Sequence, residues 1–158
     1  MIYNLTDPLK EVIPDNIHLK SGCYALLLFE ENEAKSICRL SGKDNNGILY
    51  IGKADKILKR IISLQQSVIF NSDKSQNEPI EKGHQSLSRK YFRIRKKIDV
   101  KNLRIGIWDN QEDLPEKLES YLLELYVDSY GELPPLNGQY GKYDMRELKF
   151  SSSVSLKV

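Results

Sequence analysis

Cysteine and long hydrophobic runs are scarce in this sequence, and each scarcity excludes a class of protein. The chain of 158 residues has two cysteines, Cys23 and Cys38, too few for a disulfide framework or a structural zinc site. Because each lies in an apolar segment, we expect two reduced, buried thiols in a cytoplasmic protein. No apolar run approaches the length of a membrane span, so we expect no membrane partner. The first ten residues contain Asp7 and Pro8 and lack an apolar stretch, so we predict no signal peptide.

Net charge is also small, at +2, but it is distributed unevenly along the chain. Between Lys82 and Lys101, which we call the basic segment, Asp99 is the one acidic residue. The eight basic residues of this segment are Lys82, Arg89, Lys90, Arg93, Arg95, Lys96, Lys97 and Lys101. Such a block suits contact with a phosphate backbone. From charge alone, a solvated helix face is the commoner explanation.

Hydrophobic residues make up 40% of the chain, enough for the core of one domain over residues 1–158. Short apolar runs predict strands, at residues 22–30, 36–40, 48–52 and 103–108. Helical periodicity predicts helices, at residues 55–68, 87–98 and 113–129. Asp55 can cap the first helix, and Asp113 and Pro115 suit the start of the last. The end of the chain, 151–158, suits a short edge strand or a frayed terminus. This order predicts an α+β fold, with a small antiparallel or mixed sheet flanked by helices.

Two tyrosines beside glycines are the first residues of chemical interest. Gly22-Cys23-Tyr24 opens one predicted strand and Tyr50-Ile51-Gly52 closes another, so two phenols share a surface if these strands are neighbours. Lys53 follows directly, and Arg60 comes eight residues after Gly52, on the next predicted helix. Helical phase places Arg60 at the edge of the apolar stripe, where it can point back towards the strands. Lys53 and Arg60 together would form a cationic clamp for a phosphodiester.

These residues resemble the signature of the GIY-YIG nuclease family. Residues 50–61, YIGKADKILKRI, resemble its second half, with Lys and Arg spaced as in the nuclease domain of the bacterial excision-repair incision subunit. GCY at 22–24 stands at the position of GIY, and residues 118–137 resemble the family's closing helix and the asparagine after it. Residues 83–94 are similar to a segment in some members, where a His-containing loop leads into an Arg-bearing helix. The resemblance covers about residues 20–140, and its parts are specific only in combination.

The resemblance implies a DNA endonuclease that hydrolyses phosphodiester bonds with one Mg²⁺ or Mn²⁺ ion held by Glu119. Arg60 would stabilise the transition state. Tyr24 or Tyr50 would orient or deprotonate the attacking water, with Lys53, Arg60 and the metal favouring the ionised phenol. The expected catalytic residues are therefore Tyr24, Tyr50, Lys53, Arg60 and Glu119. DNA is the expected partner, with a homodimer or a targeting partner to choose the site, and its expected contacts are His84, Arg89, Arg93, Lys97 and Asn137.

Two departures from the family pattern leave parts of this interpretation open. Tyr24 and Tyr50 are farther apart than in compact members, which implies an enlarged hairpin or an extra strand between them. Leu64 stands one turn after Arg60, where several members have a His or Tyr that helps to activate water. The general base is therefore open, with Tyr24 favoured over His84. Two other functions also stay open: a weak or inactive GIY-YIG module that only binds DNA, and a basic protein-interaction module.

Two glutamates of the last predicted helix compete for the metal. Glu124 is closer in sequence to Asn137, which favours it. Helical phase favours Glu119, which lies beside Leu123 on the apolar face, whereas Glu124 lies with Ser120 on the polar side. A carboxylate against the core needs a cation or another partner to offset its desolvation. We therefore predict that Glu119 carries the metal, the alternative being that it only pairs with a cation of the protein.

Overall fold

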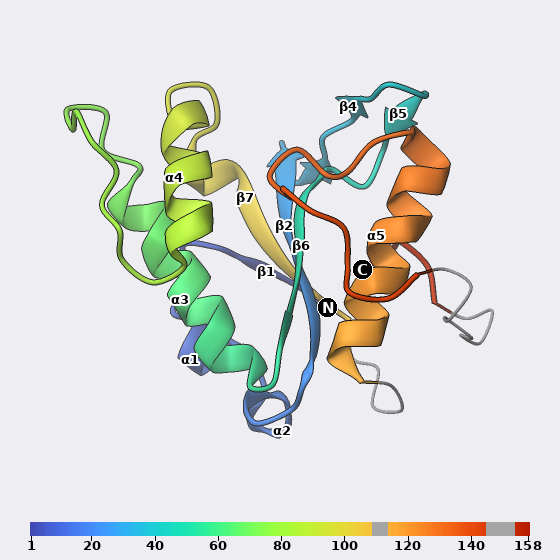
Figure 1. Ribbon diagram of the computed structural model, residues 1–158. Helices are drawn as coiled ribbons and strands as arrows, with labels where there is room; N and C mark the ends of the chain where they lie inside the picture. The colour runs from blue at the N-terminus through green and yellow to red at the C-terminus, as the bar shows by residue number, and fades with distance from the viewer. Residues whose placement is uncertain (109–113, 145–153) are drawn as a thin grey trace.

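The computed structural model describes residues 1–108, 114–144 and 154–158. Asp113, a predicted helix start, and residues 151–153 of the predicted C-terminal strand lie outside these ranges. The described residues form an α+β fold in which an antiparallel sheet lies between helices (Figure 1). None of the helices in these ranges is long and apolar enough to cross a membrane.

β2 (Gly22–Glu30) is the centre of the sheet. It pairs with β7 (Leu103–Trp108) and with β6 (Ile48–Ala54), and its far end also pairs with the short β3 (Glu33–Ala34). β1 (Ile2–Asn4) extends the sheet beyond β7, and every pairing is antiparallel. The first six residues of β2 are buried, as predicted for a strand covered on both faces.

Helices cover both faces of this sheet (Figure 1). α5 (Pro115–Tyr130) covers one face, and four helices gather on the other: α1 (Leu9–Val12), α2 (Asp15–His18), α3 (Ile57–Phe70) and α4 (Gln85–Ile94). The side chains of β2 alternate between two cores, as a strand requires. Tyr24 and Leu26 belong to the core under α3, and Cys23, Ala25 and Leu27 to the core under α5.

The predicted strands at 22–30 and 103–108 are confirmed, and the one at 48–52 continues to Ala54. The extra strand predicted between Tyr24 and Tyr50 is confirmed as β4 (Ile37–Cys38), which forms a small hairpin with β5 (Lys43–Asp44). β4 is shorter than the predicted 36–40, and β3 and β5 were not predicted. The hairpin bends early because its backbone bonds to the end of α5: Leu40 N–H donates to Glu132 and Ser41 N–H to the Tyr130 carbonyl.

The three predicted helices are confirmed, with shifted ends. Asp55 does not cap α3, because the Ile57 N–H donates to the carbonyl of Lys20 and the helix starts after Lys56. α4 starts two residues earlier than predicted, after His84, and ends at Ile94. α5 begins with Pro115, as predicted, and ends before Gly131, whose φ of +75° is the left-handed conformation that glycine favours.

Some expectations for single residues are wrong. Cys38 is exposed in the β4–β5 hairpin, whereas Cys23 is buried as expected, and both thiols are free. Ser120, expected on the polar side of α5, is fully buried because Gly141 and Tyr143 of the chain after α5 lie against it. The C-terminal residues 154–158 form no strand, although two of their carbonyl groups accept from the indole of Trp108.

Candidate active site

The candidate site lies along β6, a strand that pairs with β2 on one side only in the described sheet. Strand alternation turns Tyr50 and Gly52 towards α3, and Ile51 and Lys53 towards α5. Residues from both helical layers therefore meet around this edge. They enclose a pocket of about 650 Å³, lined by Tyr50, Lys53, Arg60, His84, Ser86, Lys90, Glu119, Leu123, Asn137, Gly138, Gln139 and Tyr140.

The two motif tyrosines lie on one face of the sheet, which confirms the predicted geometry. Tyr24 pairs directly with Gly52, and Tyr50 is two residues along the same strand, so the ring centroids are 6.2 Å apart. Gly52 is needed for this arrangement. A Cβ atom at this position would lie 2.7 Å from the ring of Tyr50 and 2.8 Å from the hydroxyl of Tyr24.

Arg60 connects the tyrosines to His84. Its Nε donates to the Tyr24 hydroxyl at 3.2 Å, and its Nη2 lies 2.9 Å from Nε2 of His84. The Tyr50 hydroxyl lies 3.2 Å from the same Nε2. The prediction that Arg60 points back to the strands from the edge of its helix is confirmed, and His84 joins the group although it is distant in sequence.

The contact with Arg60 determines the tautomer of His84. A guanidinium only donates hydrogen bonds, so Nε2 accepts and the ring proton lies on Nδ1. A neutral imidazole has one acceptor nitrogen. The contact of 3.4 Å between Leu87 N–H and Nδ1 is longer than the contact of 2.9 Å between Arg60 and Nε2, so we assign the acceptor to Nε2. Burial, and then the charge of Arg60, lower the pKa of His84 from 6.5 to about 4. His84 is therefore neutral at physiological pH, with Nε2 towards the pocket.

The pKa values of the two tyrosines are raised, whereas that of His84 is lowered. Burial raises the pKa of Tyr24 well above its usual value of 10, and Tyr50 raises it further. Burial also raises the pKa of Tyr50, with a contribution from the charge of Glu119. Arg60 lowers both values but does not outweigh burial. Arg60 therefore acts in the expected direction, but burial outweighs it and both phenols keep their protons.

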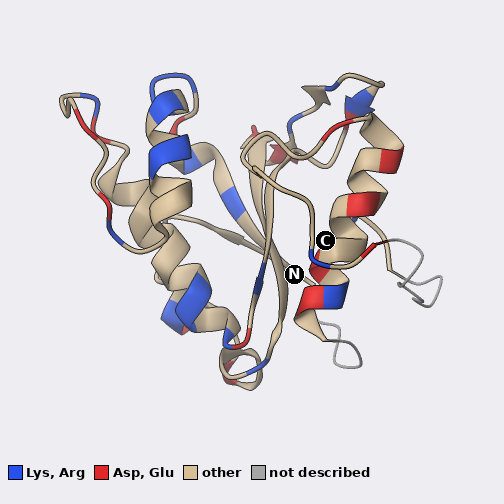
Figure 2. Ribbon diagram, in the orientation of Figure 1, with Lys and Arg blue, Asp and Glu red and all other residues tan. Residues whose placement is uncertain are grey.

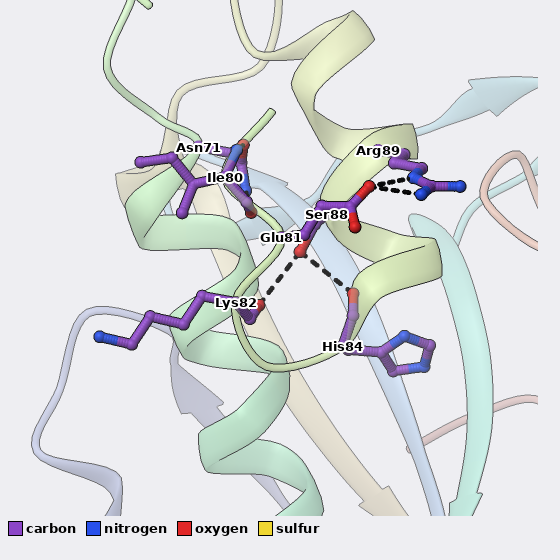
Figure 3. Close-up of polar contacts among 7 residues, drawn as sticks. All are labelled: Asn71, Ile80, Glu81, Lys82, His84, Ser88 and Arg89. Carbon is purple, nitrogen blue, oxygen red and sulfur yellow. Dashed lines mark hydrogen bonds and ion pairs between the residues drawn. The ribbon is translucent and has the colours of Figure 1, made fainter. Parts of the chain in front are cut away.

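A turn between α3 and α4 holds His84 in place (Figure 3). The buried amide of Asn71 exchanges two hydrogen bonds with the backbone of Ile80. The hydroxyl groups of Ser67 and Ser88 both donate to the carbonyl of Lys82, and Ser67 also accepts from the backbone N–H of His84. These bonds hold the backbone from which the imidazole of His84 projects.

Gly83 lets this turn approach α3. Its φ is +73°, and a Cβ atom would lie 2.1 Å from the carbonyl oxygen of Ser63. A larger residue would clash with backbone and would also be strained. The sequence Gly83-His84 is therefore a structural unit in which the glycine positions the histidine.

Glu119 enters the pocket from α5, as helical phase predicts, and Glu124 is not among the pocket residues. Burial raises the pKa of Glu119, while Lys53 and Arg60 lower it. Glu116, one turn earlier, forms an ion pair with Lys53 at 2.5 Å. Lys53 is thus neutralised by Glu116, and among the described residues no ion pair is formed by Glu119.

Glu119 is the acidic residue among those that line the pocket. No group of three His, Cys, Asp or Glu side chains gathers in the described part of the chain. A half-buried carboxylate facing a hydrated pocket suits Mg²⁺ or Mn²⁺, which keep several waters and take further oxygens from a substrate. Glu119 is the pocket residue that would hold such an ion.

Asn137 has a structural task that the sequence did not reveal. Its amide accepts from the Ile51 N–H at 2.9 Å and donates to the Ile51 carbonyl at 2.8 Å. Leu136 N–H donates to the Leu49 carbonyl, so residues 136–137 cover the outer edge of β6 as a strand would. Contact of Asn137 with DNA stays a prediction, since these two bonds occupy its amide in the structure.

The basic segment serves several purposes. Arg95 is buried and donates to the carbonyls of Asp73, Gln76 and Phe92. Lys90 donates to the Leu136 carbonyl at the pocket. Other members are exposed, and two of them pair with acids: Arg89 with Glu81, and Lys101 with Asp99. The exposed remainder, Lys82, Arg93, Lys96 and Lys97, leaves α4 and its flanks basic (Figure 2).

Sequence reasoning missed several residues of the site. Glu116 could have been found, because it lies three residues before Glu119 and so on the same side of the helix. The sequence could not have revealed Ser67, Asn71 or Tyr140, because their roles depend on which turn packs beside which helix.

Comparison with models of known protein families, with curated proteins and with solved structures finds no match for this chain. The function therefore has to be argued from the geometry of the site.

Proposed function

We propose that this protein is a metal-dependent DNA endonuclease of the GIY-YIG type. The observation that carries the proposal is one pocket to which separate segments bring a phenol, two cations, an imidazole and a carboxylate: Tyr50, Lys53, Arg60, His84 and Glu119. Tyr24 lies behind them, bonded to Arg60. Hydrolysis of a phosphodiester needs cations for the phosphoryl oxygens, a proton acceptor for water and help for the leaving oxygen.

In the proposed reaction, the phosphodiester enters between Arg60 and Lys53. Lys53 would exchange Glu116 for a phosphoryl oxygen, which is feasible because both partners of this ion pair are partly exposed. Tyr24, bonded to Nε of Arg60, keeps the guanidinium aimed at the pocket. Its high pKa suits this role, because a neutral phenol holds its proton and does not compete with the phosphate for Arg60.

His84 would accept the proton of the attacking water. Before substrate binds, burial and Arg60 keep its pKa low. An anionic phosphodiester would neutralise Arg60, and the pKa of His84 would then rise towards the range in which a histidine is an effective base. Tyr50, 3.2 Å from Nε2, would orient the water or the imidazole. Several family members have a His or Tyr at the position of Leu64, and in this chain a histidine from the turn before α4 would take that role.

Glu119 would hold the ion that the proposal requires. When bound, Mg²⁺ or Mn²⁺ would act as a Lewis acid on the phosphoryl group and stabilise the leaving oxygen. Burial disfavours the ionised form of Glu119 and raises its pKa, and a bound cation would offset this by stabilising the carboxylate.

Nicking of supercoiled plasmid DNA with and without Mg²⁺ or Mn²⁺ tests the proposal. We expect metal-dependent nicking by the wild type. Glu119→Gln should lower the rate by about 100-fold or more while sparing DNA binding. Glu124→Gln, on the same helix but outside the pocket, is the matched control and should cleave like the wild type.

The same assay separates the alternatives. If Glu124→Gln stops cleavage and Glu119→Gln does not, the assignment of the metal ligand is wrong. Salt-dependent DNA binding without nicking by the wild type would support a module that only binds DNA. Absence of DNA binding would support a protein-interaction module.

A further inference from the structure

We propose that the pocket also receives a nucleobase that has left the DNA stack, held by Gln139 and Tyr140. The substrate class would then be DNA with an unpaired nucleotide beside the cut. This inference rests on the proposed function, because it places the base next to the phosphodiester that Arg60 and Lys53 would bind.

The chain after α5 forms a loop that is pressed onto the molecule at both ends. A Cβ atom on Gly138 would lie 2.8 Å from Nζ of Lys90, and one on Gly141 would lie 2.3 Å from Cα of Ser120. At Gly141 only glycine allows this approach, because the nearest atoms include backbone. At the other end, Lys90 of α4 lies against the loop and donates to the Leu136 carbonyl. The loop is therefore anchored on α4 at one end and on α5 at the other.

The two residues between these glycines, Gln139 and Tyr140, are exposed and line the pocket. Tyr140 is 54% exposed, which is unusual for a large aromatic side chain on so tightly anchored a loop. An aromatic ring at a pocket rim offers a face on which a nucleobase can stack. The amide of Gln139 offers a donor and an acceptor, the pair of groups needed to bind the edge of a base.

The volume of the pocket and the chemistry of its two sets of lining residues also support a nucleobase as the occupant. Its volume of about 650 Å³ lies within the range of sites that enclose small molecules, and a phosphodiester group would fill only part of it. The cations Arg60 and Lys53 suit that phosphate. Leu123, Gln139 and Tyr140 instead provide an apolar wall, an amide and a ring, which suit a base.

A paired base inside a duplex cannot use these residues, because its faces are covered by its neighbours. A base must leave the stack to reach an enclosed pocket, and this costs least where the base has no partner. The geometry therefore favours bulged, gapped or single-stranded nucleotides over regular duplex.

Equilibrium binding in EDTA, where no metal-dependent cleavage occurs, tests the inference. The probes are a short fluorescent duplex and the same duplex with one extra unpaired adenosine in one strand. We expect wild-type protein to bind the bulged DNA about tenfold more tightly, the effect of one stacked base. Tyr140→Ala should lose this preference, and Tyr140→Phe should keep it because the ring remains. Phe70→Ala, which removes a partly exposed ring outside the pocket, is the control and should keep the preference.

Equal affinity of the wild type for both DNAs, or an undiminished preference in Tyr140→Ala, would overturn the inference. The plasmid assay judges the proposed function separately. Metal-dependent nicking combined with equal affinities would leave the nuclease standing and remove only the base site, whereas absence of all DNA binding would remove both.

Discussion

Gly52 has no side chain, and the two tyrosine rings occupy the space that a Cβ atom would need. This predicts the effect of the smallest substitution. Gly52→Ala would place a methyl group within 3 Å of both rings. We expect a loss of about 1–3 kcal/mol in the free energy of unfolding, as for other overpacked sites, and at least about a tenfold lower nicking rate because Tyr24 would no longer align Arg60.

Gly42→Ala is the matched control for this variant. Gly42, unlike Gly52, has a positive φ, +91°, and no atom lies within 4 Å of its added Cβ. This change should cost stability through backbone strain alone, about 1 kcal/mol, and should leave nicking unchanged. Urea unfolding and plasmid nicking measure both quantities, and full activity of Gly52→Ala would show that the rings are not held by this contact.

His84 predicts how stability depends on pH. Its pKa is about 4 in the folded chain, against 6.5 for an ordinary histidine, so between these values the unfolded chain binds a proton that the folded chain does not. The folded state therefore gains stability from a neutral His84 above pH 6.5 and loses it as pH falls towards 4. His84→Gln should weaken this loss. Urea midpoints measured at pH 7 and pH 4.5 give the comparison, and equal losses in both proteins would contradict the assignment.

At the scale of elements, the end of α4 is held by hydrogen bonds from Arg95, the residue that follows the helix. Arg95→Gln would remove the buried guanidinium that donates to the partly buried carbonyls of Asp73, Gln76 and Phe92. We expect about 2–4 kcal/mol less stability in urea unfolding, because several hydrogen bonds to a charged donor would be lost at once. Arg93→Gln, on the exposed face of the same helix, should change stability by less than about 0.5 kcal/mol. Similar losses in the two variants would mean that Arg95 is not structural.

The edge of β6 shows how one element prepares the site. A free strand edge has unpaired backbone groups, and here residues 136–137 satisfy those of Leu49 and Ile51. The same residues lead directly into the loop that bears Gln139 and Tyr140. One short segment, residues 136–140, therefore both covers the edge of the sheet and forms one wall of the pocket.

Across the whole molecule, charge is divided between the two helical layers. Basic side chains lie on α4 and at the start of α3, and acidic ones follow α5 (Figure 2). We therefore predict that DNA approaches from the α3–α4 side. Arg93→Gln combined with Lys97→Gln should weaken binding and reduce the slope of log affinity against log salt by about 2, one for each lost phosphate contact.

Lys10→Gln combined with Lys43→Gln removes the same charge from exposed positions on α1 and β5 and should leave that slope unchanged. The measurement is binding of a labelled duplex at several salt concentrations. An unchanged slope in the α4 variant would return the basic segment to a solvated helix face.

The sequence by itself determined the features that depend on local periodicity. Helical phase turned Arg60 and Glu119 inward, because a side chain's direction follows from its position in a helix. Alternation along 22–30 and 48–52 allowed Tyr24 and Tyr50 to share a face, and the pairing of the two strands then brought them together. The α+β class followed from the order of these elements. The starts and ends of helices were less certain, because they depend on contacts such as that of Ile57 with Lys20.

The tertiary structure alone decided what depends on neighbours distant in the chain. It buried Ser120 and exposed Cys38, used Arg95 and Asn137 to hold backbone, and brought His84 into contact with Arg60 and Tyr50. Each of these outcomes depends on how much water a side chain loses and which charges surround it. Both are set by segments far apart in sequence, and no local pattern in the chain encodes them.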